Sequence, residues 1–263
     1  MRRWLSAPDP CTNYQKALKQ HQVNTGLWFL NSDQYAEWIA NANSTLWLHG
    51  IPGCGKTILS SAILYSLLQH CSGDPGKAVV YFYFDFNDVQ KQNPELMLRS
   101  LISQLSQKCI RIPKSFEALF SSCDNGHRQP SLQALQEVVR RMIREFPHVY
   151  IVLDALDECS ERIELMDVLE TMAAWNLQNL HILLTSRKER EIESVLETFI
   201  DQRNVISLQS RLVDGDIQKY VRQRLSTDRC LDKWQKDATI KREIEDALMK
   251  GAHGMYGSHH GIC

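Results

Sequence analysis

The sequence of 263 residues lacks an excess of either charge: 30 Lys and Arg stand against 31 Asp and Glu, a formal charge of −1. Proteins dedicated to nucleic acid or to anionic membranes usually present a basic surplus, so this balance disfavours both classes of partner. Long apolar runs are missing too. The longest, Ala78–Phe84, falls far short of the roughly 20 residues that cross a bilayer as a helix. We therefore expect no membrane span.

Cysteine and histidine patterns typical of disulfide scaffolds or zinc sites are also missing. The eight cysteines show no CxxC or Cys/His ligand spacing, and a chain of this length needs no disulfides for its stability. We interpret them as reduced thiols of a cytoplasmic protein. His253, His259 and His260 lack an acidic or cysteine partner at ligand spacing, which favours a disordered tail over a metal site.

From Ser44 onward, apolar runs alternate with segments of helical period, as in a parallel sheet with crossover helices. The runs are Thr45–His49, Ala78–Phe84, Val149–Leu153, Leu180–Thr185 and Val205–Leu208. The helical segments are Lys56–Cys71, Pro94–Lys108, Ser131–Phe146 and Ala238–Lys250, and we expect Gly251 to end the last of them. A further helix is expected after the run Val205–Leu208, with Asp214 or Asp216 as its N-cap. The pattern predicts an α/β fold with a five-stranded, mainly parallel sheet. We divide the chain into a flank (1–43), a core (44–210), a helical extension (211–256) and an irregular tail (257–263).

One contiguous motif indicates a phosphate site. Gly50-Ile51-Pro52-Gly53-Cys54-Gly55-Lys56-Thr57 fits GxxxxGK[ST] and lies between a strand and a helix, the context that the motif requires. Its backbone N–H groups and the helix N-terminus can bind a β-phosphate. The ammonium of Lys56 can lie between the β- and γ-phosphates, and the Thr57 hydroxyl can ligate a Mg²⁺ ion. We predict binding of ATP or GTP with Mg²⁺ by residues 50–57 and Ile58. Cys54 has no identifiable base beside it, so a tolerated loop position is favoured over a nucleophile.

A second motif is the acidic end of the strand at Val149–Leu153. Asp154, Asp157 and Glu158 follow it, at the sheet edge where ligands collect in open parallel sheets. Such a cluster by itself is more often a helix N-cap than a metal site, but the upstream phosphate loop reverses that preference. Asp154 is then predicted to hold Mg²⁺, and either Asp157 or Glu158 to polarise the water that attacks the γ-phosphate.

Two further features leave alternatives open. Thr185-Ser186-Arg187 ends another strand, where Arg187 can read a γ-phosphate or be a solvated side chain in a surface turn. The aromatic residues Trp28, Phe29, Tyr35 and Trp38 favour core packing, with a wall for a nucleotide base as the second interpretation.

These blocks, taken together and in order, resemble the NACHT domain of fungal STAND proteins, in particular ankyrin-repeat and heterokaryon-incompatibility-like receptors. The resemblance rests on Thr25–Leu30, Leu46–Thr57, Tyr81–Phe86, Leu153–Cys159 and Leu184–Arg187. It implies a P-loop NTPase core of the ASCE class, with an extra strand between the phosphate loop and the acidic strand. It further implies that Asp154 is the Walker B acid, that Asp157 and Glu158 extend that motif, that Arg187 is sensor 1, and that the flank near Thr25–Leu30 helps enclose the base.

The implied function is a signalling switch of NLR type that binds and slowly hydrolyses ATP or GTP and acts through self-association. Relatives continue beyond Lys250–Tyr256 with further domains, whereas this chain ends at Cys263, so we expect a truncated form. The alternative is a non-hydrolysing scaffold that uses the same fold for assembly. A small-molecule kinase is disfavoured, because no Arg-rich lid insertion lies between the second and third strands.

Overall fold

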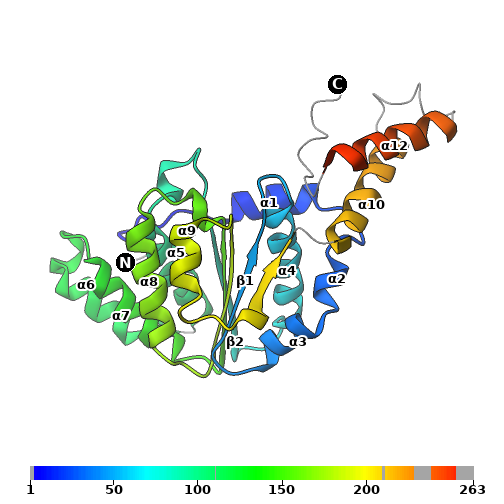
Figure 1. Cartoon of the computed structure of the whole chain (residues 1–263). Helices are drawn as coiled ribbons and strands as arrows, with labels where there is room; N and C mark the ends of the chain where they lie inside the picture. Colours follow the sequence, from blue (N-terminus) through cyan, green and yellow to red (C-terminus); the bar gives the residue numbers. More distant parts are fainter. Residues whose placement is uncertain (1–2, 110, 209–210, 228–237, 253–263) are drawn as a thin grey trace.

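The computed structural model describes residues 3–109, 111–208, 211–227 and 238–252. Its centre is a five-stranded sheet with helices on both faces (Figure 1). The strands are β1 (Ser44–His49), β2 (Lys77–Tyr83), β3 (His148–Asp154), β4 (Leu180–Ser186) and β5 (Val205–Ser207). All neighbouring strands run parallel, and each strand end lies within one residue of the run predicted from the sequence. The α/β class and the parallel sheet are confirmed.

The strand order, β2-β3-β4-β1-β5, places β4 between the strand before the phosphate loop and the strand that ends in Asp154. This is the extra strand that the family resemblance implied. The register pairs Leu48 with Thr185 and Leu153 with Leu184, so β1, β3 and β4 end at one edge of the sheet. The loops that follow these strands therefore meet there.

Side chains along each strand alternate between two cores. In β3, Val149, Ile151 and Leu153 belong to one core, whereas Tyr150 and Val152 belong to the other. Because both faces of the sheet are covered, its strands read as nearly continuous apolar runs. That is why they could be located from the sequence.

The helices form two layers (Figure 1). One layer consists of α5 (Pro94–Lys108), α7 (Leu132–Ile143), α8 (Arg162–Ala174) and α9 (Arg190–Leu196), with α6 (Lys114–Ser122) packed outside against α7. The other contains α3 (Asp33–Ala40) and α4 (Lys56–His70), joined by part of α10 (Arg211–Thr227). Of these, α3, α6, α8 and α9 were not predicted. The segment predicted to start at Ser131 does so: the Ser131 hydroxyl caps α7 by accepting the N–H of Ala134.

The flank before β1 is helical and packs on the sheet. It comprises α1 (Cys11–Gln20), α2 (Leu27–Leu30) and α3, and α1 lies against α4. Phe29, Tyr35 and Trp38 are buried, and the indole N–H of Trp38 donates to the carbonyl of Ile182 in β4. Core packing is therefore the role of these three aromatic side chains.

Two details of the helical extension differ from the prediction. The helix α10 begins at Arg211, so neither Asp214 nor Asp216 is its cap, and α12 (Ala238–Ala252) continues past Gly251. The predicted tail, with His259 and His260, and also His253 lie outside the described residues. Within the described residues, no helix combines the length and the apolar character needed to cross a membrane.

Candidate functional site

The phosphate loop joins β1 to α4. Gly53 and Gly55 have φ angles of +75° and +90°, a conformation that glycine adopts without steric strain. The side chain of Cys54 is buried against Gly50, where any Cβ would meet its sulfur at 2.5 Å. Burial raises the pKa of the Cys54 thiol, which disfavours a thiolate nucleophile and supports the structural interpretation of this cysteine.

Lys56, the first residue of α4, turns its ammonium back over the loop. Its Nζ donates to the carbonyls of Gly50 at 2.9 Å and of Ile51 at 3.1 Å. The ammonium thus lies at the mouth of the loop beside the N-terminus of α4, so two sources of positive potential face the same volume.

Asp154 joins the phosphate loop to β4. Its carboxylate accepts hydrogen bonds from the hydroxyls of Thr57 and Thr185, each at 2.7 Å. Burial raises its pKa, an effect that the hydrogen bonds from Thr185 and Thr57 oppose. The structure therefore brings together the two residues predicted to hold a metal. The contribution of Thr185 was missed; a polar residue at the end of the intervening strand was the available signal.

Asp157 and Arg187 form a pair at the adjacent strand ends. The carboxylate of Asp157 lies 2.9 Å from Nε of Arg187 and accepts the main-chain N–H of the same residue. The Asp157 side chain is buried, and Arg187 is partly exposed toward a cavity that both residues line. Arg187 is thus fixed by a buried partner, unlike a freely solvated surface arginine.

Glu158 is half-buried beside this pair. Its Oε2 accepts the main-chain N–H of Phe86 at 3.1 Å. Burial raises the pKa of Glu158, the N–H of Phe86 lowers it, and the charges of Asp157, Asp154 and Asp85 raise it further. A carboxylate with a raised pKa is a better proton acceptor near neutral pH than an ordinary one.

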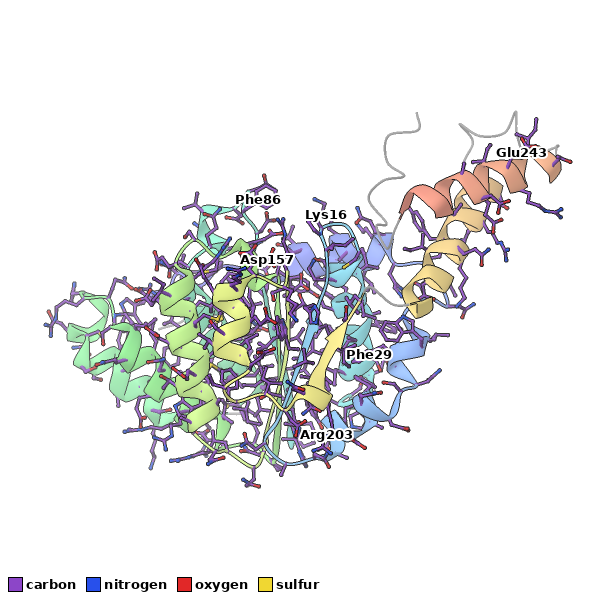
Figure 2. All side chains as sticks on the ribbon, viewed as in Figure 1. Lys16, Phe29, Phe86, Asp157, Arg203 and Glu243 are labelled. Carbon is purple, nitrogen blue, oxygen red and sulfur yellow. The ribbon has the colours of Figure 1, made fainter. Side chains whose placement is uncertain are left out.

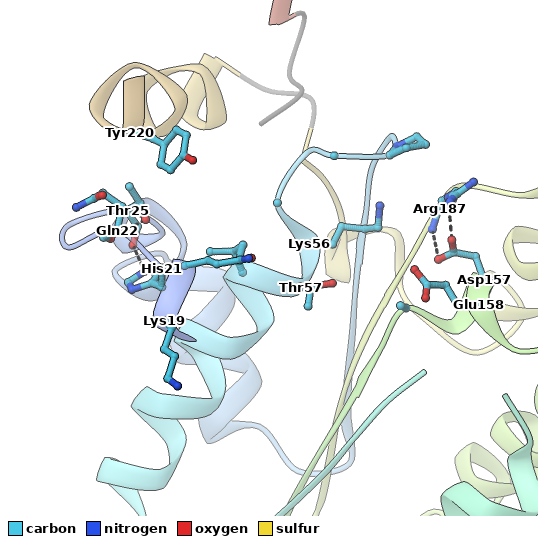
Figure 3. A pocket seen from close by; sticks show the side chains of 16 residues that line it. Lys19, His21, Gln22, Thr25, Lys56, Thr57, Asp157, Glu158, Arg187 and Tyr220 are labelled. Carbon is cyan, nitrogen blue, oxygen red and sulfur yellow. Dashed lines mark hydrogen bonds and ion pairs between the residues drawn. The ribbon is translucent and has the colours of Figure 1, made fainter. Parts of the chain in front are cut away.

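A cavity of about 630 Å³ is lined by Lys56, Thr57, Asp157, Glu158 and Arg187 (Figure 3). Asp154 is buried and does not line it, but contacts it through Thr57. Phosphate-loop residues lie between the Asp157–Arg187 pair and a second wall formed by the end of α1 and by α10. That second wall consists of Lys19, Gln20, His21, Gln22, Thr25 and Tyr220. Apart from Thr25, sequence reasoning missed them, because nothing in their local pattern marks them as binding residues.

Polar contacts join the two parts of the second wall, which are far apart in the sequence. Gly26, with φ of +77°, donates its main-chain N–H to the buried carboxylate of Asp216 in α10. Lys219 pairs with the same carboxylate at 3.1 Å and donates to the carbonyl of Asn24. Helix α10 is therefore fastened to the turn that borders the cavity.

Comparison with known proteins assigns the chain to a family. The family model described as "Nephrocystin 3, N-terminal" matches residues 24–187, more than half of the chain. The chain belongs to this family. The match covers the phosphate loop, the acidic motif and Arg187, but neither α1 nor α10.

A curated relative supports the assignment. The chain is 24% identical over 238 residues to vegetative incompatibility protein HET-E-1 of Podospora anserina. The alignment covers 87% of this chain and only 17% of the relative, so the chain spans about a sixth of that protein's length. Together, the two matches identify a NACHT-like P-loop NTPase domain.

A solved structure shows the same fold. The Aeropyrum pernix ORC1 protein, solved in complex with DNA, has a TM-score of 0.51 and 15% identity, with 88% of this chain and 61% of that chain covered. A Walker-type ATPase of Pyrococcus abyssi has a TM-score of 0.47 and 15% identity, with 84% and 62% covered. At 15% identity, the likeness to the ORC1 protein shows the fold alone.

Proposed function

We propose that this domain binds a nucleoside triphosphate with Mg²⁺ and hydrolyses it slowly. The observation that carries the proposal is the contact between the Thr57 hydroxyl and the buried Asp154 carboxylate, 2.7 Å apart, at the wall of the cavity that Thr57 lines. It joins the two motifs whose combination a P-loop NTPase needs. ATP and GTP are both compatible with it.

The donor set fits Mg²⁺, which prefers hard oxygen ligands and usually retains several waters. Asp154 is fully buried, its oxygens accept from hydroxyls, and burial raises its pKa. A divalent cation bound there would compensate the negative charge. Thr57 and Asp154 are the residues that we propose hold it, Asp154 directly or through water. When bound, the ion would neutralise charge on the β- and γ-phosphates.

For the attack on the γ-phosphate, we assign the water-polarising role to Glu158. The two carboxylates left open by the sequence differ in their partners: Asp157 is held by Arg187, whereas Glu158 accepts a single main-chain N–H. The raised pKa of Glu158 suits a general base. Asp157 then serves to hold Arg187, which we propose interacts with the γ-phosphate.

We propose that the second wall, around His21, Thr25 and Tyr220, encloses the nucleoside. It lies across the phosphate loop from the acidic residues, and the Tyr220 ring offers a face on which a purine can stack (Figure 3). Because α10 forms part of this wall, nucleotide occupancy would bias the position of the helical extension. That link supports a switch function. We propose that the domain belongs to a cytoplasmic signalling protein of the STAND type that acts through self-association.

Nucleotide binding to the full chain tests the proposal. Fluorescent ATP and GTP should bind in the presence of Mg²⁺, and Lys56→Ala should weaken binding strongly. The control is Lys114→Ala, which removes an exposed lysine at the start of α6 and should bind as wild type does. Folded protein that binds neither nucleotide contradicts the proposal. Binding without any release of phosphate would favour the non-hydrolysing scaffold.

A further inference from the structure

The loop between β2 and α5, residues 84–93, forms hydrogen bonds with Glu158 and with the two residues that follow it. Besides the N–H of Phe86 on the Glu158 carboxylate, the carbonyl of Gln92 accepts the N–H of Ser160 at 2.9 Å and the thiol of Cys159 at 3.0 Å. The loop thus contacts both the side chain of Glu158 and the backbone that follows it.

Packing of large apolar side chains does not fix the tip of this loop. The side chains of Phe86 and Val89 are 64% and 80% exposed. Phe86 projects from the edge of the sheet at which Asp157 also lies (Figure 2). Phe84, at the start of the loop, is buried in the core, but these two side chains remain in solvent, so the position of the tip depends on its polar contacts.

One set of those polar contacts surrounds a buried lysine, whereas the side-chain amide of Gln92 donates separately to the carbonyls of Phe86 and Asp85. Lys91 is only 6% exposed, and its Nζ donates to the Asn13 side-chain oxygen at 2.5 Å and lies 3.3 Å from the Asp88 carboxylate. The amide of Asn13 donates in turn to Asp85 at 2.8 Å. Burial would raise the pKa of Asp85, but hydrogen bonds from Asn87 and Asn13 and the charge of Lys91 hold it below its ordinary value.

Asn13 belongs to α1, whose other end lines the cavity at Lys19 and Gln20. The same helix therefore contacts the loop that supports Glu158 at its start and the second wall at its end. Lys91 is buried and takes no part in the proposed chemistry, so packing alone gives no reason for a charged side chain at this position.

We propose that Lys91 and Asn13 are positioning residues for Glu158, acting through the loop of residues 84–93. This inference rests on the proposed hydrolysis. General-base catalysis depends on placing the carboxylate within hydrogen-bond reach of its water, and a displacement of about 1 Å can cost about a hundredfold in rate.

The test compares Lys91→Met, which keeps most of the side-chain volume, and Asn13→Ala with the wild-type full chain. Each should lower kcat for phosphate release by about tenfold or more while changing nucleotide affinity by less than about twofold. Lys16→Ala, at an exposed position on α1, is the control and should behave as wild type does. Amide exchange of residues 84–88 should accelerate in both variants but not in the control.

Two readouts separate positioning from a general loss of stability. Loss of the Phe86 hydrogen bond raises the pKa of Glu158, so the acidic limb of the kcat profile should move to higher pH in Lys91→Met. In a Glu158→Gln background, Lys91→Met should cause no further loss of rate. If Lys91→Met does not fold, Asn13→Ala provides both readouts.

Wild-type kcat and an unmoved pH limb in a folded variant overturn the inference. Loss of nucleotide affinity in both variants also overturns it, because the residues would then serve binding. An unaffected Glu158→Gln enzyme instead contradicts the assignment of Glu158 in the proposed function, whatever the exchange data show.

Discussion

The carboxylate of Asp157 holds Arg187 at two points, its main-chain N–H and its side-chain Nε, each at 2.9 Å. The pair connects the turn after β3 to the end of β4. It also fixes an arginine at the edge of the cavity that holds the phosphate loop. Its energetic contribution can be measured without any nucleotide.

Arg187→Ala leaves the buried Asp157 carboxylate without its cation. We expect the free energy of unfolding to fall by about 1–3 kcal/mol, because a buried acceptor loses its charged partner. Urea denaturation measures it. Arg203→Ala, which breaks an exposed pair with Asp201, should leave the unfolding curve unchanged. Equal effects of the two substitutions would contradict a structural role for the buried pair.

Thr185→Val removes a hydroxyl that donates to Asp154 and accepts the N–H of Ala155. The side chain keeps its shape, so the loss is that of two buried hydrogen bonds, and we expect a destabilisation of about 1–3 kcal/mol. Thr185→Ser retains the hydroxyl and should remain closer to wild type. A valine variant more stable than the serine variant would refute this account of Asp154.

Thr57→Ala removes the hydroxyl that we propose binds Mg²⁺. The gain in nucleotide affinity that Mg²⁺ gives the wild type should largely disappear, whereas Thr57→Ser should keep it. Titrations of fluorescent nucleotide with Mg²⁺ and with EDTA measure the difference. If the alanine variant keeps the full effect of Mg²⁺, Thr57 is not a ligand.

His181 should make stability depend on pH. It is buried in β4, where its Nδ1 contacts the Ser44 hydroxyl at 2.8 Å, and burial lowers its pKa from 6.5 to about 4. The folded state therefore favours the neutral ring. The contribution of His181 to the free energy of unfolding should be fully present above pH 6.5. It should decline as the pH falls toward 4, because the unfolded chain then binds the proton before the folded chain does.

Denaturation curves between pH 4 and 8 test this dependence. His181→Gln should lose part of the acid-induced destabilisation, while the exposed His127→Gln should retain it. An identical pH dependence in the His181→Gln variant and the wild type would exclude His181 as the source.

The sequence predicted those parts of the site that are contiguous. The phosphate loop is a single motif, and β3 is an apolar run buried on both faces, so local pattern sufficed for Lys56, Thr57 and Asp154. Their meeting follows from the parallel order of the strands. The assignments of roles to these residues remain predictions.

Long-range contacts explain what the sequence did not predict. Asp216 was one of two residues, with Asp214, expected to cap a helix, but its carboxylate instead accepts the N–H of Gly26, which local cap preferences cannot anticipate. Likewise, His21 and Tyr220 reach the cavity from segments about 200 residues apart, and only the packing of α10 on the flank brings them together.

Because β4 lies between β1 and β3, its end contacts both acidic parts of the site. Thr185 touches the acid that the phosphate loop also touches, and two residues later Arg187 pairs with Asp157. A shift of β4 along its axis would therefore disturb the Asp154 cluster and the Arg187 pair at the same time. Substitutions deep in this strand, far from any ligand, should impair both together.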